Sequence, residues 1–174
     1  MTDQGIGAPV RRKEDFRFIT GQGRYVDDIN RPGQAYAYFL RSPHAHANIR
    51  SIDLAAANAA PGVVAIFTGD DIAADKVGGL ICGWAIFNKD GSPMRAAAHP
   101  ALAQGKVRYV GDHVAVVIAD TLAQARDAAE LINVDYEVLP AAADMAAARK
   151  PGAPTIHAEA PDNQFYDWEL GDKA

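Results

Sequence analysis

The chain alternates short apolar stretches with polar, glycine-containing breaks, and most of these stretches have the pattern of β-strands. Residues 34–41 are apolar on both alternating faces, which is typical of a strand covered on both sides. We therefore expect this strand to be central in its sheet. Residues 48–52 predict a second strand, and residues 62–68, which are apolar and rich in β-branched side chains, predict a buried one. Residues 133–138 alternate cleanly, as a strand with one solvent-exposed face does.

Two further apolar runs, residues 107–110 and residues 113–119, meet across Gly111-Asp112. Glycine readily takes the positive φ that a tight turn needs. The pattern therefore predicts a β-hairpin with its turn at this dipeptide.

Helix signals stand between the strands. Asp53 precedes a short predicted helix at residues 54–60, where its carboxylate would accept the free amide hydrogens, and Pro61-Gly62 ends that helix. Asp70 is expected to cap another short turn in the same way. An alanine-rich segment, residues 141–149, predicts the last helix.

The strongest helix signal follows residue 120. Thr121 and Gln124 have the spacing of a capping box, in which each side chain satisfies a free amide at the helix start. The apolar side chains after them fall on one stripe of a helix. These are Leu122, Ala125, Ala128, Ala129 and Ile132.

Strands interspersed with short helices predict an α/β or α+β fold, in which short helices pack on one side of a mixed sheet, and we expect the α+β class. Residues 1–33 contain Gly, Asp, Arg and Pro without helical or strand periodicity, and we expect an extended N-terminal arm there. Residues 34–150 then form the main domain, and residues 151–174 a C-terminal tail.

The longest irregular stretch, residues 73–106, is broken by glycines and prolines. Loops of this length are usually functional, mobile or packed on a neighbour. Trp84 and Phe87 are apolar anchors within it, so we expect an interface with another domain or chain.

Composition narrows the possible classes. The net charge of −5 is spread over the chain without the basic cluster that nucleic acid binding requires. No segment approaches the roughly 20 apolar residues of a membrane span, and residues 1–9 have no apolar stretch of signal-peptide length. The only cysteine, Cys82, allows no internal disulfide and no thiolate cluster for zinc or iron and sulfur. We therefore expect a cytoplasmic protein with no nucleic acid partner and no membrane span.

Two histidines are the first candidates for chemistry. His44 and His46 stand two residues apart at a strand end, where their rings can point the same way and share a metal ion. No acidic or cysteine ligand lies at a recognisable spacing from them. We favour polar histidines at a surface or interface over a metal site.

Other motifs also favour structural roles. Gly21-Gln22-Gly23 lacks the third glycine and the preceding strand of a nucleotide-binding loop, so a bent arm explains it better. The acidic pairs Asp27-Asp28 and Asp70-Asp71 suit turns and helix starts, where capping explains them without catalysis.

Two remaining candidates are Cys82 and a group of aromatic residues. Cys82 has no basic residue at a spacing that suggests an activated thiolate, so we expect it to be buried. Tyr36, Tyr38 and Phe39 have a period of two without interleaved basic residues, which indicates core and not a platform for stacking bases. No serine lies in a Gly-x-Ser-x-Gly context. The sequence therefore assigns no catalytic, cofactor-binding or metal-binding residue to this chain.

A series of short motifs nevertheless runs nearly end to end. They are Arg12 with Asp15, residues 20–28 (TGQGRYVDD), 40–47 (LRSPHAHA), Ile52-Asp53, 61–64 (PGVV), Leu102-Ala103, 107–117 (VRYVGDHVAVV), 125–129, 134–140 (VDYEVLP), Asn163 and Gly171-Asp172. In order and spacing they resemble the N-terminal part of the large subunit of the molybdenum hydroxylases, the family of xanthine dehydrogenase, aldehyde oxidase and aerobic carbon monoxide dehydrogenase. Gly5, Arg11 and Arg12 are most similar to the carbon monoxide dehydrogenase branch. The resemblance implies that this region folds as the α/β hammerhead domain.

The resemblance also implies a function. In that family the contacts to molybdopterin and molybdenum, and the glutamate that acts as base, lie in domains C-terminal to this one, and no position here matches them. The parent enzyme would hydroxylate carbon monoxide, aldehydes or purines with oxygen from water, and iron–sulfur clusters and FAD in partner domains or subunits would carry the electrons. This domain would then be a structural and assembly domain, inactive by itself. It would contact the molybdopterin-binding domains of its own subunit and the iron–sulfur and flavin subunits.

An alternative of a different class is a stand-alone module that binds a small molecule or a protein and has no redox role. Because the chain stops at Ala174, just after Gly171-Asp172, we expect an excised piece or a protein divided between polypeptides. The reading frame after Ala174 discriminates between the two: continuation into a glycine-rich catalytic region removes the alternative.

Overall fold

The computed structural model describes Gly7 and residues 9–171. The chain divides into two compact units, Met1–Gln34 and Ala35–Ala174. Two residues of the motif series, Gly5 and Asp172, lie outside the described residues.

The described part of the first unit is an arm with two short helical turns and no buried residue, α1 (Asp15–Ile19) and the 3-10 turn η1 (Val26–Asp28). Arg12 pairs with Asp15 at 3.0 Å, and the rings of Phe18 and Tyr25 stack with centroids 5.5 Å apart. The arm thus has local order without a core of its own.

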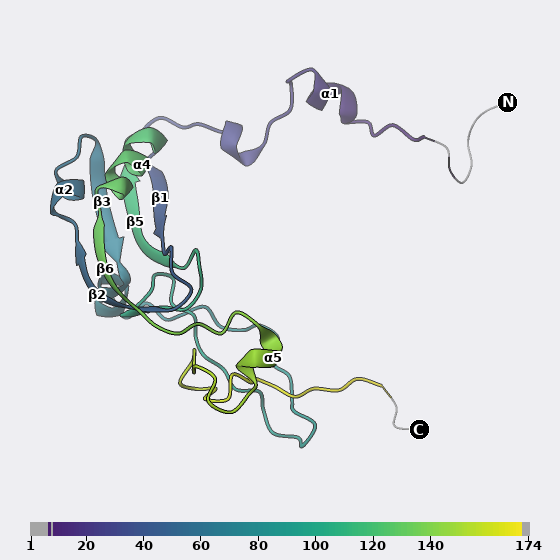
Figure 1. The fold of residues 1–174 in the computed structure, drawn as a ribbon. Coiled ribbons are helices and arrows are strands. Elements are labelled where there is room, and N and C mark those ends of the chain that lie inside the picture. The colour runs from purple at the N-terminus through teal and green to yellow at the C-terminus, as the bar shows by residue number, and fades with distance from the viewer. Residues whose placement is uncertain (1–6, 8, 172–174) are drawn as a thin grey trace. The chain divides into compact units, whose positions relative to one another are not determined.

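The second unit contains two three-stranded sheets, and every strand pair in them is antiparallel (Figure 1). The first sheet has the order β1-β5-β3, with β1 (Tyr36–Arg41), β5 (His113–Ala119) and β3 (Val63–Thr68). The second has the order β4-β2-β6, with β4 (Lys106–Val107), β2 (Ala47–Asp53) and β6 (Asn133–Val138). The expected α+β class is confirmed, with two antiparallel sheets in place of one mixed sheet.

Four short helices complete the unit: α2 (Ala55–Asn58), α3 (Gly69–Ala74), α4 (Leu122–Glu130) and α5 (Met145–Ala148). Helix α4 packs on the first sheet, where its Ala125, Ala128 and Ala129 meet Ala115 and Val117 of β5 in the main core (Figure 1). Alanine side chains let the helix backbone approach the sheet closely. None of the helices in the described residues has the length and apolar character needed to cross a membrane.

A second core cluster contains Ala47 of β2, Ala103, Val107 of β4 and Val114 of β5. Ile52 and Val134 pack against both clusters, so the apolar interior continues from one sheet to the other. The second sheet therefore shares its interior with the first.

Strand β1 is confirmed, but its expected central position is wrong. It pairs only with β5 and lies at the edge of its sheet, and Phe39 on its outer face is exposed. Strand β3, expected to be buried, is the other edge strand, with Val64 and Phe67 exposed. Strand β5 pairs with both β1 and β3, which places β1 and β3 at the two edges of the sheet, and helix α4 packs against all three strands.

The predicted hairpin at Gly111-Asp112 is also wrong, although the turn exists and Gly111 has a φ of +94°. Residues 106–107 pair with β2 in the second sheet, whereas residues 113–119 pair with β1 and β3 in the first. The chain therefore crosses between sheets at this turn. The amide of Gly111 donates to the Ser42 carbonyl, and the amide of Ser42 donates to the Asp112 carbonyl, both at 2.8 Å. The turn is therefore held by backbone hydrogen bonds to Ser42, just after β1, and not by hydrogen bonds between two adjacent strands of a hairpin.

Two helices are capped by the residues that the sequence predicted. Thr121 Oγ1 accepts from the amide of Gln124 at 3.2 Å at the start of α4, which is one half of the predicted capping box; the Gln124 side chain accepts from the Thr121 hydroxyl and not from its amide. The carboxylate of Asp53 accepts from the amide of Ala55 at 2.9 Å just before α2.

The other two helix starts differ from the expectation. Asp71, not Asp70, caps α3: its Oδ2 accepts from the Thr68 amide at 2.7 Å and from the Thr68 hydroxyl at 2.8 Å. Helix α5 begins later than predicted, because the Asp144 carboxylate accepts from the amide of Ala147 and fixes the start there.

Candidate functional site

The predicted candidate residues do not converge on one centre. His46 is buried, with 4% of its surface exposed, and its Nδ1 lies 2.7 Å from the Pro140 carbonyl oxygen. The expectation of a surface position is therefore wrong for His46. The half-buried ring of His44 packs edge-on against Tyr136, with centroids 5.0 Å apart. Among the described residues no three His, Cys, Asp or Glu side chains lie close enough together to hold a metal ion.

The acidic and glycine motifs are parts of local structure. Gly21 has a φ of +71° at the end of α1, as a bent arm requires. The Asp28 carboxylate accepts from the amide of Tyr25 at 2.9 Å and caps η1. Cys82 was expected to be buried and is instead exposed; its Sγ lies 3.3 Å from the Trp84 carbonyl oxygen.

The clearest candidate for function is a surface made by two segments that are far apart in the sequence. The loop at residues 80–95 and the tail at residues 164–170 run together, away from the sheets and next to α5 (Figure 1). The amide of Lys89 donates to the Asp167 carbonyl and the amide of Arg95 donates to the Phe165 carbonyl, both at 2.8 Å. These bonds give the loop a fixed backbone although it contains no strand.

Ion pairs also connect the loop to the tail. Lys89 Nζ lies 3.0 Å from the Asp167 carboxylate, which raises the pKa of Lys89. Arg95 pairs with Asp162, and its guanidinium lowers the pKa of that carboxyl group. Arg149, just after α5, also reaches Asp162, at 3.4 Å. The tail is therefore tied both to the loop and to the last helix.

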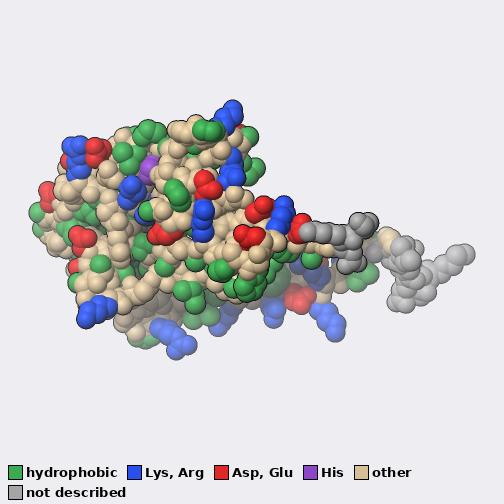
Figure 2. Space-filling model, turned by 90° about the horizontal axis from the view of Figure 1, so that it is seen from below, with side chains coloured by type: hydrophobic (Ala, Val, Ile, Leu, Met, Phe, Trp, Pro, Cys, Tyr) green, Lys and Arg blue, Asp and Glu red, His purple; other side chains and the backbone are tan. Residues whose placement is uncertain are grey.

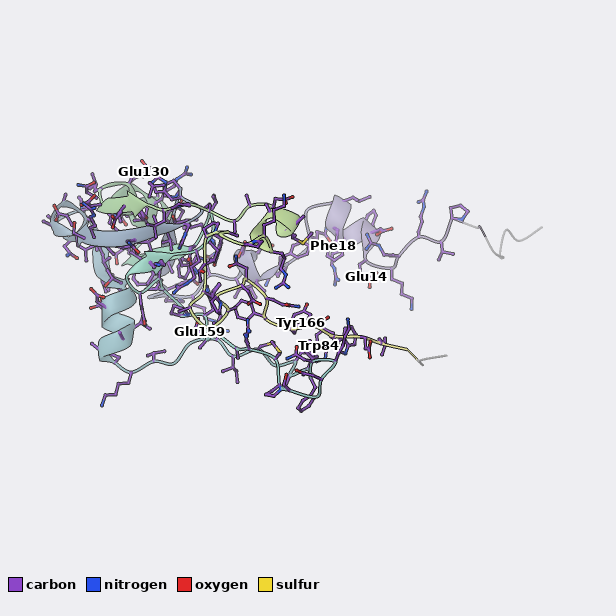
Figure 3. The ribbon with its side chains drawn as sticks, turned by 60° about the horizontal axis from the view of Figure 1, so that its bottom comes forward. Glu14, Phe18, Trp84, Glu130, Glu159 and Tyr166 are labelled. Carbon is purple, nitrogen blue, oxygen red and sulfur yellow. The ribbon has the colours of Figure 1, made fainter. Side chains whose placement is uncertain are left out.

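Large apolar side chains are exposed along the two segments. Trp84 is 67% exposed and Phe87 is 64% exposed, and the ring of Trp168 meets that of Trp84 edge-on with centroids 5.9 Å apart. We call the set the loop surface: Leu80, Ile81, Trp84, Phe87, Tyr166, Trp168 and Leu170. Figure 3 labels Trp84 and Tyr166 on its two segments. Figure 2 shows hydrophobic side chains exposed between charged side chains of both signs on one face of the molecule.

The loop surface is mainly apolar and aromatic, and Lys89 and Arg95 of the same loop form ion pairs with the tail. Exposed aromatic clusters rimmed by charge are typical of protein interfaces. The sequence indicated Trp84 and Phe87 but missed the contribution of the tail, because Tyr166, Trp168 and Leu170 follow no periodic pattern.

Comparisons with known proteins identify the family of the chain. Residues 20–140 match the model of the family described as aldehyde oxidase and xanthine dehydrogenase, a/b hammerhead domain. The chain is 38% identical over 183 residues to the carbon monoxide dehydrogenase large chain of Afipia carboxidovorans, covering 98% of this chain and 21% of the relative. It is 39% identical to the nicotine 6-hydroxylase large subunit of Paenarthrobacter nicotinovorans, covering 94% of this chain and 19% of the relative.

Solved structures give the same assignment. Quinoline 2-oxidoreductase from Pseudomonas putida 86 matches with a TM-score of 0.71 at 43% identity, over 80% of this chain and 17% of that one. Carbon monoxide dehydrogenase from Oligotropha carboxidovorans matches with a TM-score of 0.71 at 38% identity, over 88% of this chain and 18% of that one. The chain spans about a fifth of the length of the relatives it matches. Its motif order, its two-sheet fold and these matches together show that the chain belongs to the aldehyde oxidase and xanthine dehydrogenase a/b hammerhead domain family.

Proposed function

We propose that this chain is a structural and assembly domain of the large subunit of a molybdenum hydroxylase. The observation that carries the proposal is the loop surface, an exposed aromatic cluster on a backbone fixed by the tail, in a domain that matches about a fifth of much longer oxidoreductase chains. One such relative is the xanthine dehydrogenase molybdenum-binding subunit of Escherichia coli O157:H7. The domain would contact the molybdopterin-binding domains of its own subunit and the iron–sulfur and flavin subunits.

The physical role is to hold reacting groups in register. The binding energy of an interface concentrates in a few aromatic side chains that become buried in the complex. Trp84, Phe87 and Trp168 are exposed aromatic side chains that a partner would bury. A displacement of about 1 Å far from the reacting atoms can cost on the order of a hundredfold in rate. A support built on paired segments, and not on a free loop, suits this requirement.

The described residues do not supply the ligands of a metal centre. They offer no group of three possible metal ligands, and the sequence has one cysteine, whereas an iron–sulfur cluster requires several thiolates. The proposal therefore assigns the molybdenum cofactor to other domains of the large subunit, and iron–sulfur clusters and FAD to partner domains or subunits. The parent enzyme would oxidise carbon monoxide, aldehyde or purine type substrates with water as the oxygen source, in the cytoplasm.

The first test uses residues 1–174 alone. The purified chain is assayed with carbon monoxide, aldehydes and purines and an artificial electron acceptor, and its bound metal and pterin are measured. We expect no turnover and no bound cofactor. Measurable turnover, or molybdopterin that stays with the chain, contradicts the proposal.

The second test asks whether the loop surface supports assembly. This chain replaces its counterpart in the large chain of the Afipia carboxidovorans carbon monoxide dehydrogenase, to which it is 38% identical. The double substitution Trp84→Ser and Phe87→Ser should reduce co-purification of the other subunits about tenfold or more, with unchanged unfolding of the isolated domain. The matched control replaces the exposed Leu122 and Leu131 at the ends of α4. If both pairs behave alike, or if the first pair unfolds the domain, the loop surface is not the interface.

A further inference from the structure

A second feature of the molecule is a small pocket separate from the loop surface. It has a volume of about 150 Å³ and lies between residues 97–104, the approach to the Gly111 turn and the start of the tail. Its polar lining is His99, Gln104, Arg108, His157 and Glu159. Figure 3 labels Glu159 on the tail, apart from Trp84 and Tyr166.

Arg108 is the unusual residue in this pocket. Its Nε is shielded from solvent and has no hydrogen-bond partner among the described residues. None of the ion pairs between described residues includes it. Its amide is fixed by the buried Asp112 carboxylate at 3.0 Å, so the start of the side chain is held in place. A buried guanidinium N–H without an acceptor costs free energy, and the described residues leave the hydrogen-bonding capacity of Arg108 incompletely used.

Charged and ionisable groups of both signs surround Arg108. Burial lowers the pKa of His157, and the nearby Arg108, His99 and His46 lower it further, while Glu159 opposes them. His99 Nε2 lies 3.3 Å from the Tyr109 hydroxyl and 3.8 Å from Asp112 Oδ1. The Asp112 carboxylate already accepts a hydrogen bond from the Arg108 amide. Among the described residues, Arg108 and Glu159 form no ion pair with each other.

We propose that this pocket binds an oxyanion, a carboxylate or a phosphate group, with Arg108 as its principal donor. The planar guanidinium binds two oxygens of such a group at once, and the imidazoles of His157 and His99 supply further donors when protonated. The anion can come from an acidic side chain of an adjoining polypeptide or from a phosphate-bearing molecule. The inference does not depend on the proposed function, because the residues that carry it all lie in this chain.

The test is a titration of residues 1–174 with inorganic phosphate and, separately, with acetate at constant ionic strength, followed by the imidazole resonances of the histidines. Saturable shifts at His157 and His99 are expected, with a rise in the pKa of His157. Arg108→Met should weaken binding about tenfold or more, since it removes a charge-assisted contact. The matched control Arg126→Met changes an exposed arginine on α4 and should leave binding unchanged.

Two further variants keep the test decisive if Arg108→Met fails to fold. Arg108→Lys keeps the charge but loses the paired donors, so binding should weaken by a smaller factor. Glu159→Gln removes the opposing carboxylate and should tighten binding. Saturation by acetate alone assigns the site to a carboxylate, and saturation by phosphate alone assigns it to a phosphate group. No saturable shift with either anion, or shifts that are the same in the Arg108 and Glu159 variants as in the unaltered chain, overturns the proposal.

Discussion

Asp112 is 2% exposed and occupies the turn through which the chain passes from one sheet to the other. Its Oδ2 accepts from the Arg108 amide at 3.0 Å, and its carbonyl accepts from the amide of Ser42 at 2.8 Å. A single residue therefore joins the end of β1 to the segment after β4. Buried acceptors of this kind are costly to remove, because the donor they satisfy is left unpaired.

We expect Asp112→Ala to lower the free energy of unfolding by about 2 kcal/mol, since the Arg108 amide would lose its acceptor. Asp112→Asn keeps an oxygen at the same position and should cost less. Urea unfolding of the three proteins measures both values. Equal losses for the two variants would show that the charge, and not the hydrogen bond, is what stabilises the turn.

A pH-dependent contribution is expected from Asp71. Hydrogen bonds from the amide and hydroxyl of Thr68 lower the pKa of Asp71 from its ordinary value of 3.8. A carboxyl group with a lowered folded pKa stabilises the protein above its unfolded pKa and loses that effect as the pH falls through the folded pKa. The stability difference between the unaltered chain and Asp71→Asn should thus be full at pH 7 and shrink below pH 3.8. A pH-independent difference, measured by urea unfolding across this range, contradicts the assignment.

At the level of elements, α3 is held against the chain before β4 by a close backbone approach. A Cβ added to Gly69, the first residue of α3, would lie 2.1 Å from the Ala103 carbonyl oxygen. Backbone atoms cannot rotate away as a side chain can, so the helix start itself must shift. Glycine is therefore required here by packing and not by φ.

Gly69→Ala should reduce the free energy of unfolding by about 3 kcal/mol through overpacking. Gly78→Ala is the matched control, because a Cβ there meets nothing within 4 Å and the residue has no positive φ. Its effect should stay within about 0.5 kcal/mol. The thermal midpoints of the two variants test the difference. Similar midpoints would mean that α3 moves away from Ala103 without loss.

The local sequence pattern predicted whether a segment is a helix or a strand better than it predicted which strands pair with each other. The residues of β2, β6 and α4 carry the correct periodicity, and Thr121 marks the start of α4. Both apolar faces of β1 indicated a central strand, yet β5 holds that position. Periodicity records which faces of a segment are apolar, but it does not record which distant segment covers them.

At the scale of the whole molecule, the arm and the main unit are separate compact units. No described residue of the arm is buried, so its removal should leave the interior of the main unit intact. We propose that the domain boundary lies close to the predicted one, between the arm and β1.

A chain of residues 35–174 should therefore unfold within about 0.5 kcal/mol of the full chain. Denaturant unfolding of both lengths, followed by tryptophan fluorescence, provides the comparison, since Trp84 and Trp168 lie in the part that is kept. A loss of stability well above 1 kcal/mol would place the arm in the cooperative unit.

The sequence alone determined the α+β class, most strand and helix positions, and the family resemblance, because these depend on residue types and short spacings. It also led to the expectation that Trp84 and Phe87 lie at an interface, and the structure shows both side chains exposed. Only the tertiary structure decided that residues 106–107 and 113–119 enter different sheets, that His46 is buried, and that Arg108 and His157 of the tail line one pocket. Each of these depends on contacts between segments tens of residues apart, which are fixed by packing of the whole chain and leave no local pattern.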